Sequence, residues 1–340
     1  MKKQTGKPNI LKEKVQPAIS RNGPIVILVI LFIVSCLAFG SAFLSSFNLT
    51  NLIRQISIAA IASVGINFVI ITGGRDLSVG AVCAVSSMVM AYTSRYGFAI
   101  AIGSALLSGI LLGLLNGLII TKLGVQPFVA TLGTQLGAKG IALLINNENS
   151  MPLDAANSAP FNMLGRGYLY GIPIPVVIML IVIGMAYFVS KYTRFGRAVY
   201  AVGGNEESAI MMGVLVERTK VIVFTISGLT AAIAAIVLSS RLGAGLPSAG
   251  DGWDMTLMAS VVIGGTLVRG GVGDMRGVLV GALICGIITN MLNMLGSVNA
   301  YWQSIINGML LLVAVVMQTV SANQSEKKKA VETEAVAVPE

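Results

Sequence analysis

Long apolar runs, separated by short polar connections, dominate this chain and restrict it to one broad class of fold. The charged fraction is 11% and the mean hydropathy is +0.84, whereas soluble globular domains carry charges at about 25% of their residues. Apolar runs of about 20 residues are typical of helices that cross a membrane. We therefore expect an all-α, polytopic membrane protein with about ten transmembrane helices, predicted at residues 24–44, 52–72, 77–93, 97–120, 127–145, 173–190, 221–240, 256–268, 277–296 and 301–320.

The positions of lysine and arginine predict how the chain is oriented. Six basic residues precede the first apolar run, and Lys327–Lys329 follow the last. Because basic residues are enriched on the cytoplasmic side, both termini are expected there, and ten crossings give the even number that this requires. Residues 191–220 and 269–276 would then be cytoplasmic, and residues 146–171 and 241–255 external. A secretory signal also begins with basic residues, but the many later runs favour a retained anchor.

These assignments divide the chain into one membrane domain and two tails. Cytoplasmic tails are expected at residues 1–23 and 321–340, and the transmembrane domain at residues 24–320. Residues 191–220 form its long cytoplasmic connection. No loop is long enough to hold a separate enzyme domain.

Composition argues against catalysis and against nucleic acid as a partner. The chain has no histidine, the commonest metal ligand and the usual base of a nucleophilic triad. Its cysteines, Cys36, Cys83 and Cys285, lie within apolar runs without CxxC spacing, so neither a disulfide framework nor a metal site is expected. The net charge of +9 comes from basic residues at the ends of apolar runs, which is a signal of topology. We expect no enzyme activity, no cofactor and no metal.

One motif places charge where a membrane would penalise it. Ile71–Gly80 read ITGGRDLSVG, so that Arg75 and Asp76 follow the glycine pair Gly73–Gly74 between two apolar runs. An ionisable side chain at membrane depth is costly and usually faces a protein interior or a watery pathway, and glycines allow a helix to break there. The motif predicts a broken helix beside a translocation route, with Arg75, Asp76 and Ser78 near the solute. A tight turn between two spans is the alternative.

Two apolar segments resemble each other at one fixed offset. Ala105–Leu118 read ALLSGILLGLLNGL and Ala282–Leu295 read ALICGIITNMLNML. In the ten-span arrangement the two segments cross in opposite directions, as in an inverted-topology repeat, where the solute binds near the midplane. Asn116 and Asn293 would be equivalent positions, either in contact with solute or in hydrogen bonds between helices. A chance match between two apolar segments is also open.

The chain shows no means of hydrolysing ATP. Its glycine-rich segment Gly270–Gly277 (GGVGDMRG) lacks the lysine of a phosphate-binding loop, and Arg276 occupies the place of the third glycine of a dinucleotide motif. The nearby pair Gly264–Gly265 predicts a second helix break. Asp76 is one of few acidic residues at membrane depth, so the chain has few groups that could form a proton relay. A separate motor subunit is the better explanation.

Residues 191–220 contain the segment where such a motor would dock. After the turn at Gly203–Gly204, acidic residues open a short run that ends at a glycine, which are helix start and stop signals. Three apolar side chains of this run would face the cytosol and fit a groove of a partner. A solvated turn that returns the chain to the membrane is the alternative. The coupling residues would be Asn205, Glu206, Glu207, Ser208, Ile210, Met211, Met212 and Gly213.

Three motifs together resemble one family. Ile71–Gly80, Thr193–Val214 (TRFGRAVYAVGGNEESAIMMGV) and Val261–Gly296 are similar to the permease subunit of ribose-type ABC sugar importers of bacteria, in matching order. The resemblance implies a pair of permeases, identical or paralogous, in the lipid of the cytoplasmic (inner) membrane. It also implies a cytoplasmic ATPase with two fused nucleotide-binding domains, an external sugar-binding protein, and a coupling helix at Ser208–Gly213.

The chain departs from this family pattern at positions near the expected route. Arg75 replaces an apolar residue, and the segment that follows Trp253 carries Asp254 where a Glu is typical and Thr256 where an Asp is typical. These departures bear on which sugar is carried. Arg75 is also adjacent to Asp76, and a turn would allow the two side chains to pair. The expected pathway residues are Asp76, Arg75, Ser78, Asn116, Asn293, Trp253 and Asp254.

The sequence therefore predicts a permease that moves a monosaccharide or a related polyol inward, driven by a partner ATPase. Two alternatives stay open. The first is a related permease for another small solute, an amino acid or a nucleoside. The second is a stand-alone ion-coupled carrier, which would transport without an ATPase. The lack of histidine and of a clustered acid–base pair disfavours a membrane enzyme.

Overall fold

The computed structural model describes residues 10–296 and scattered positions between residues 302 and 316. In this part the protein is all-α except for four strands of two residues each. The helices are α1 (Ile10–Leu44), α2 (Ser46–Ile71), α3 (Val79–Thr93), α4 (Phe98–Lys122), α5 (Pro127–Leu144), α6 (Ser158–Arg166), α7 (Ile174–Tyr192), α8 (Arg194–Gly204), α9 (Glu206–Met211), α10 (Val216–Leu242), α11 (Trp253–Ile263) and α12 (Met275–Met294). Strands β1 (Met151–Pro152) and β4 (Ala244–Gly245) pair, as do β2 (Tyr168–Leu169) and β3 (Ile172–Pro173), both antiparallel.

Six described helices are long and apolar enough to cross a membrane: Gly23–Leu44 within α1, then α2, α4, α7, α10 and α12. The multi-pass membrane architecture is therefore clear. The runs expected at 77–93, 127–145 and 256–268 form α3, α5 and α11, which are shorter or less apolar. The run expected at 301–320 lies mostly outside the described residues. The count of ten spans stays a prediction.

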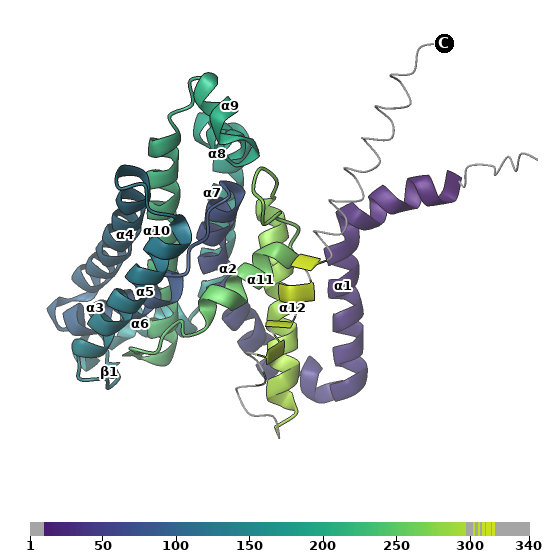
Figure 1. Cartoon of the computed structure of the whole chain (residues 1–340). Coiled ribbons are helices and arrows are strands. Elements are labelled where there is room, and N and C mark those ends of the chain that lie inside the picture. The colour runs from purple at the N-terminus through teal and green to yellow at the C-terminus, as the bar shows by residue number, and fades with distance from the viewer. Residues whose placement is uncertain are drawn as a thin grey trace, which may run out of the picture.

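The middle of the bundle is formed by α2 and α10 (Figure 1). From Ile56 to Ile71 every residue of α2 except Ala59 is buried. A helix that is apolar on all sides must be enclosed by protein or lipid, and α2 is enclosed by α7, α10, α11 and α12. Phe68 and Phe224, both fully buried, belong to the same core.

The helices around this pair run in opposite directions. The last residue of α4, Lys122, pairs with Glu217 in the first turn of α10, so α4 and α10 are antiparallel. Met275 at the start of α12 accepts a hydrogen bond from Asn67 near the end of α2, and Asn290 near its end bonds Asn48 near the start of α2. Thus α12 is antiparallel to α2, as α10 is, while α4 runs parallel to α2.

Two breaks interrupt the helices at the predicted glycine pairs. Helix α2 ends at Ile71, Gly73 has a φ of 78°, and α3 begins only at Val79. Helix α11 ends at Ile263, directly before Gly264–Gly265, and Gly265 has a φ of 102°. Such positive φ values favour glycine because it has no Cβ. The sequence located both breaks correctly.

Small residues bring α4 and α10 into backbone contact. A Cβ added to Gly228 would lie 2.1 Å from the carbonyl oxygen of Gly109, and one added to Gly109 would lie 2.4 Å from that of Gly228. Such close approach is typical of glycine at helix crossings in membranes, where packing drives association. The crossing of α4 and α10 therefore depends on these glycines.

We expect Gly228→Leu to separate α4 from α10 and to destabilise the protein by about 1–3 kcal/mol or more, the usual cost of overpacking. The loss would appear as a lower midpoint of thermal unfolding for the purified protein in one detergent. Gly103→Leu is the matched control, because Gly103 is also on α4 but no atom lies within 4 Å of its added Cβ. Equal midpoints for the two variants would contradict the assignment.

Candidate functional site

Asp76 lies in the break between α2 and α3 and is only 2% exposed. Its Oδ1 accepts hydrogen bonds from the backbone N–H of Ser78 (2.9 Å) and from the Ser78 hydroxyl (2.7 Å). Its Oδ2 accepts one from the Ser227 hydroxyl on α10 (2.6 Å). Because a buried carboxylate needs several donors to replace water, these three bonds explain how Asp76 is accommodated.

Two further helices contribute side chains to this buried polar network. Asn116 of α4 donates from Nδ2 to the Ser78 hydroxyl (2.8 Å), and Thr131 of α5 accepts from the backbone N–H of Leu77 (3.2 Å). The Oδ1 of Asn116 is buried and has no hydrogen-bond partner. A buried acceptor without a partner is costly, so Asn116 retains capacity to bind a hydroxyl or a water. The network thus joins the break to α4, α5 and α10.

Arg75 does not belong to this network. Its side chain is exposed, and both oxygens of Asp76 are occupied by Ser78 and Ser227. The expected pairing of Arg75 with Asp76 is therefore wrong. In the non-helical segment between α2 and α3 the Asp76 side chain is buried, whereas the side chain of its neighbour Arg75 is exposed.

The start of α11 lies beside the start of α3. A Cβ added to Gly80 would lie 2.2 Å from the carbonyl oxygen of Gly250 and 3.6 Å from the Cβ of Trp253. Trp253 and Asp254 are half-buried in the first turn of α11. Asp76 and Ser78 lie in the break that leads into α3, and Trp253 and Asp254 lie in the first turn of α11, so four expected pathway residues belong to two segments that meet.

Asn293 does not share a site with Asn116. It is exposed in the last turn of α12, three residues after Asn290, which bonds Asn48 near the start of α2. Asn116 instead is fully buried one turn and a half before the end of α4. Because α4 and α12 run in opposite directions, the two residues lie toward opposite ends of the molecule. Matching positions in the repeat do not give them matching surroundings.

The expected short helix in the 191–220 connection is present as α9. Its N-cap is Asn205, whose Oδ1 accepts from the Ser208 backbone N–H (2.7 Å), and its first turn holds Glu206 and Glu207. The helix starts two residues earlier than the predicted run and ends at Met211, before Gly213, whose φ is 77°. Ala209 is buried, whereas the apolar tip is exposed: Ile210 by 58%, Met211 by 87% and Met212 by 69%.

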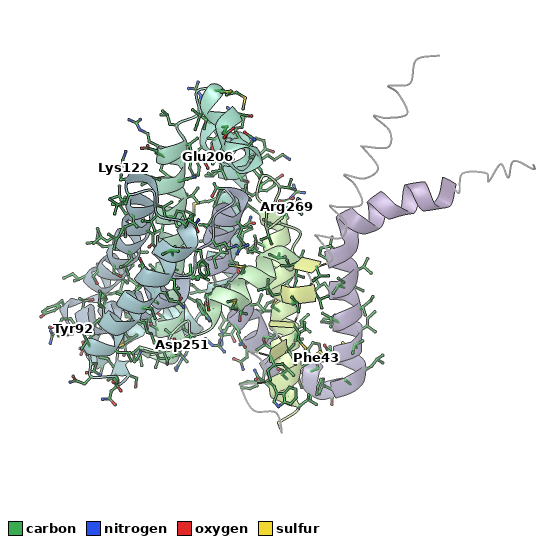
Figure 2. The ribbon with its side chains drawn as sticks, viewed as in Figure 1. Phe43, Tyr92, Lys122, Glu206, Asp251 and Arg269 are labelled. Atoms are coloured by element: carbon green, nitrogen blue, oxygen red, sulfur yellow. The ribbon has the colours of Figure 1, made fainter. Side chains whose placement is uncertain are left out.

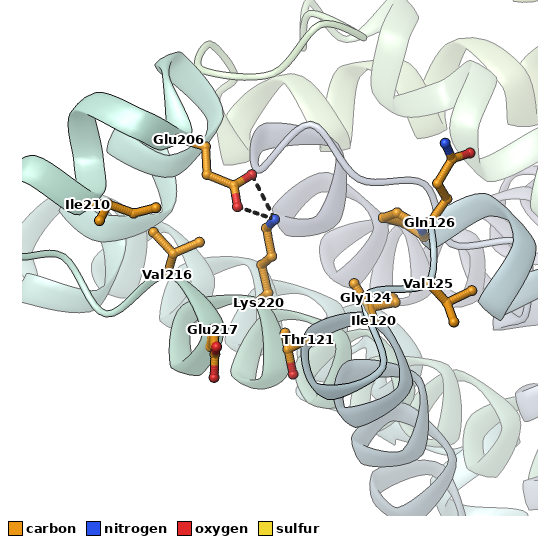
Figure 3. A pocket seen from close by; sticks show the side chains of 11 residues that line it. Ile120, Thr121, Gly124, Val125, Gln126, Glu206, Ile210, Val216, Glu217 and Lys220 are labelled. Carbon is orange, nitrogen blue, oxygen red and sulfur yellow. Dashed lines mark hydrogen bonds and ion pairs between the residues drawn. The ribbon is translucent and has the colours of Figure 1, made fainter.

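A cleft of about 440 Å³ lies between α9, the start of α10 and the α4–α5 connection. Lys220 of α10 extends across it to Glu206 of α9, at 2.7 and 2.8 Å from the two carboxylate oxygens (Figure 3). A second ion pair, between Lys122 and Glu217, ties α4 to α10 beside it. The cleft is lined by Ile120, Thr121, Gly124, Val125, Gln126, Pro127, Glu206, Ile210, Val216, Glu217 and Lys220.

Some residues of these sites were not singled out from the sequence. Ser227 and Thr131 hold Asp76 and Leu77, and Lys139 of α5 binds the carboxylate of Asp251 in the loop before α11. The available signal was weak, since a hydroxyl inside an apolar run occurs in many membrane helices. Among the described residues, no three His, Cys, Asp or Glu side chains lie close enough together to hold a metal ion.

Comparison with known proteins assigns the chain to a family. The model of the family described as branched-chain amino acid transport system / permease component matches residues 48–315. The chain belongs to this family. The match covers most of the chain and confirms the resemblance to importer permeases that three motifs indicated.

Several curated relatives of this permease are named for sugars. It is 39% identical over 297 residues to the ribose import permease protein of Bacillus subtilis, covering 87% of this chain and 91% of that protein. It is 39% identical over 279 residues to the D-allose transport system permease protein of Escherichia coli, covering 81% and 84%. It is 34% identical over 300 residues to the fructose import permease protein of Rhizobium meliloti, covering 86% and 83%.

We expect Asp76→Ala to destabilise this permease by about 1–3 kcal/mol, because the buried donors of Ser78 and Ser227 lose their acceptor. Asp76→Asn should cost less, since an amide oxygen still accepts from Ser78 and the amide N–H can donate to the Ser227 hydroxyl. Thermal unfolding of the purified variants would measure both losses.

Asp251→Ala is the control for this comparison, because the Asp251 carboxylate is 60% exposed and binds only Lys139 on the surface. It should change the unfolding midpoint little. If Asp76→Asn is as damaging as Asp76→Ala, the negative charge of Asp76 is required and an amide cannot replace its hydrogen bonds.

Proposed function

We propose that this protein is the permease subunit of an ABC importer and that it moves a monosaccharide or a related polyol into the cytoplasm. The observation that carries this proposal is similarity over more than four-fifths of the chain to permeases named for ribose, allose and fructose. The polar groups around the α2–α3 break provide hydrogen-bonding chemistry that suits hydroxyl-bearing solutes.

An amino acid is the second candidate for the solute. It is supported by the description of the family itself, which names branched-chain amino acid transport. The described region offers little for the charged ends of an amino acid, because the Asp76 carboxylate already accepts three hydrogen bonds. Arg75 is exposed and Asp254 half-buried. A sugar therefore remains the better proposal.

The partners follow from what the chain lacks and what it exposes. It contains no phosphate-binding loop, so we propose that a cytoplasmic ATPase with two nucleotide-binding domains supplies the energy. Helix α9, with its exposed tip of Ile210, Met211 and Met212, would enter a groove of that ATPase. An external sugar-binding protein and a second permease, identical or paralogous, would complete the importer.

We propose that α9 and both termini are cytoplasmic in a bacterial inner membrane. Figure 2 supports this orientation, because Lys122, Glu206 and Arg269 lie toward one end of the bundle and Phe43, Tyr92 and Asp251 toward the other. The first group belongs to the connections that the positive-inside rule assigns to the cytoplasm. Ten crossings would include α3, α5 and α11, with the last run at 301–320.

An inverted repeat is also part of the proposal. The matched segments lie on α4 and α12. The first residues of these helices, Phe98 and Met275, are separated in sequence by the same offset as the two segments. Contacts correspond as well: α10 packs against α3 and α4, and α2 packs against α11 and α12. Such repeats place the solute site between the halves, where α3 and α11 begin side by side.

Transport in reconstituted vesicles would test the function. With an ATPase subunit and a binding protein added, we expect ATP-dependent accumulation of one of the labelled sugars ribose, allose and fructose, and none in vesicles that lack the permease. Accumulation of leucine instead would favour the amino acid alternative. Uptake that persists without any ATPase would favour an ion-coupled carrier and contradict the proposal.

We expect Met211→Asp to reduce coupled transport by about tenfold or more, because losing one buried methionine contact costs about 1.5–3 kcal/mol. The measurements are sugar uptake and ATP hydrolysis by the same assembled complex, and hydrolysis should persist while uptake falls. Gly213→Pro should act similarly by distorting the turn after α9.

Met211→Leu is the matched control, since it keeps an apolar tip and should transport normally. The variants lie outside the bundle, so the amount of permease in the membrane should not change. Normal transport by Met211→Asp with the ATPase bound would show that α9 is not the coupling element.

A further inference from the structure

Three arginines from distant parts of the chain meet at one place on the bundle. The Arg54 guanidinium on α2 donates to the carbonyl oxygen of Arg166 (2.6 Å), and the Arg166 Nε donates to the carbonyl oxygen of Arg241 (2.7 Å). The backbone of Arg241 also packs against α6, because a Cβ added to Gly165 would lie 2.2 Å from the Arg241 nitrogen. We refer to Arg54, Arg166 and Arg241 as the three-arginine cluster.

The three-arginine cluster lies at the end of the bundle opposite α9. Arg241 is in the last turn of α10, whereas Lys220, which binds α9, is near its first turn. At 1.5 Å per residue these two positions are roughly 30 Å apart along the helix axis. The two ends of α10 therefore approach opposite surfaces of a bilayer whose hydrocarbon core is about 30 Å thick.

No carboxylate of the described region compensates the three-arginine cluster. The ion pairs found there join Lys122 with Glu217, Lys139 with Asp251 and Lys220 with Glu206. The Nε of Arg54 is buried without a hydrogen-bond partner. The positive charges of three arginines that meet without a nearby carboxylate repel each other. Binding of an anion would therefore lower the electrostatic energy of the cluster.

An exposed aromatic hairpin stands beside the three-arginine cluster. Strands β2 and β3 directly precede the membrane helix α7, and the turn between them carries Tyr170, which is 99% exposed. Tyr168 lies under the Arg54 guanidinium at 4.8 Å and is 54% exposed. Tyrosines next to the end of a membrane helix are typical of the level of the lipid headgroups. The neighbouring Leu169 and Ile172 are also exposed.

We propose that the three-arginine cluster binds the phosphate of an anionic phospholipid in the leaflet opposite α9. Guanidinium groups match phosphate oxygens in geometry and charge, and the hairpin tyrosines would contact the headgroup region and the glycerol end of the acyl chains. Lipid is favoured over a protein carboxylate because exposed apolar side chains border the cluster. Basic residues are usually enriched on the cytoplasmic side of a membrane, whereas the three-arginine cluster lies at the opposite end from α9. A bound anion would account for arginines at that end.

A simpler role would be to cap α10. Arg166 binds the carbonyl of Arg241 near the helix C-terminus, where positive charge is favourable. Capping alone predicts no preference among lipids. The preference for an anionic headgroup is therefore the quantity that separates the two roles.

The test is lipid retention by the purified full-length protein, measured by native mass spectrometry in micelles with phosphatidylglycerol or phosphatidylcholine of equal chain length. We expect wild type to retain phosphatidylglycerol preferentially. Arg166→Gln and Arg54→Gln should weaken that retention about tenfold, as expected for one lost charge-assisted bond. Arg95→Gln is the matched control. Arg95 also lies over tyrosine rings, those of Tyr92 and Tyr96, but it is outside the three-arginine cluster.

Equal retention of phosphatidylglycerol by Arg166→Gln and Arg95→Gln would overturn the proposal, as would a wild type without lipid preference. Displacement of the lipid by an equal concentration of inorganic phosphate would show that a free anion is the ligand. Unchanged lipid retention together with weaker capture of an external binding protein by Arg166→Gln would assign the cluster to a protein partner. None of these measurements uses an ATPase. A negative result would therefore count against lipid binding and not against the proposed transport function.

Discussion

The buried carboxylate of Asp76 holds together the place where α2 stops and α3 begins. Inside a membrane every backbone group released by a helix break must find a partner within the protein. Asp76 receives the N–H of Ser78, Thr131 receives that of Leu77, and the carbonyl of Ile71 accepts from the N–H of Gly271. Because each partner comes from a different element, the break fixes how α5 and the α11–α12 loop lie against α2.

The same helix that supports Asp76 also carries the contact to α9. Lys220 binds Glu206 of α9, and Ser227, seven residues further along α10, donates to Asp76. Seven residues are two turns, so both contacts lie on one face of α10, about 10 Å apart. A displacement of α10 along its axis would change the α9 contact and the α2–α3 break together, without any intermediate loop.

The sequence predicted the features that follow from periodicity, charge and glycine: the all-α class, both helix breaks and the short helix at α9. It could not predict which side chain completes a buried site. Asp76 was recognised from the sequence because a charge in an apolar run is rare. Ser227 was not recognised, because serines in such runs are common. The pairing of Arg75 with Asp76 that a turn would allow is not seen, because Ser78 and Ser227 occupy the Asp76 oxygens and the Arg75 side chain is exposed. Asn116 and Asn293 match in sequence and lie toward opposite ends, as an inverted repeat requires, but the sequence did not reveal that Asn116 is buried and Asn293 exposed.

The two extremes of hydropathy among the described spans are also the two extremes of burial. Among the six apolar spans, α1 is the most apolar and the least buried, whereas α2 is the least apolar and the most buried. A helix enclosed by protein can hold Asn67, because its side chain bonds Thr266 and Met275 on other segments, whereas the hydroxyls of Ser57 and Thr72 bond the backbone of α2 itself. A helix facing lipid has no such partners and must stay apolar. Helices α3 and α11, which meet beside Asp76, are apolar but short, so length rather than polarity distinguishes them from the six spans. A helix that ends at membrane depth is tolerated only where protein encloses its end, and the first turns of α3 are buried in the bundle.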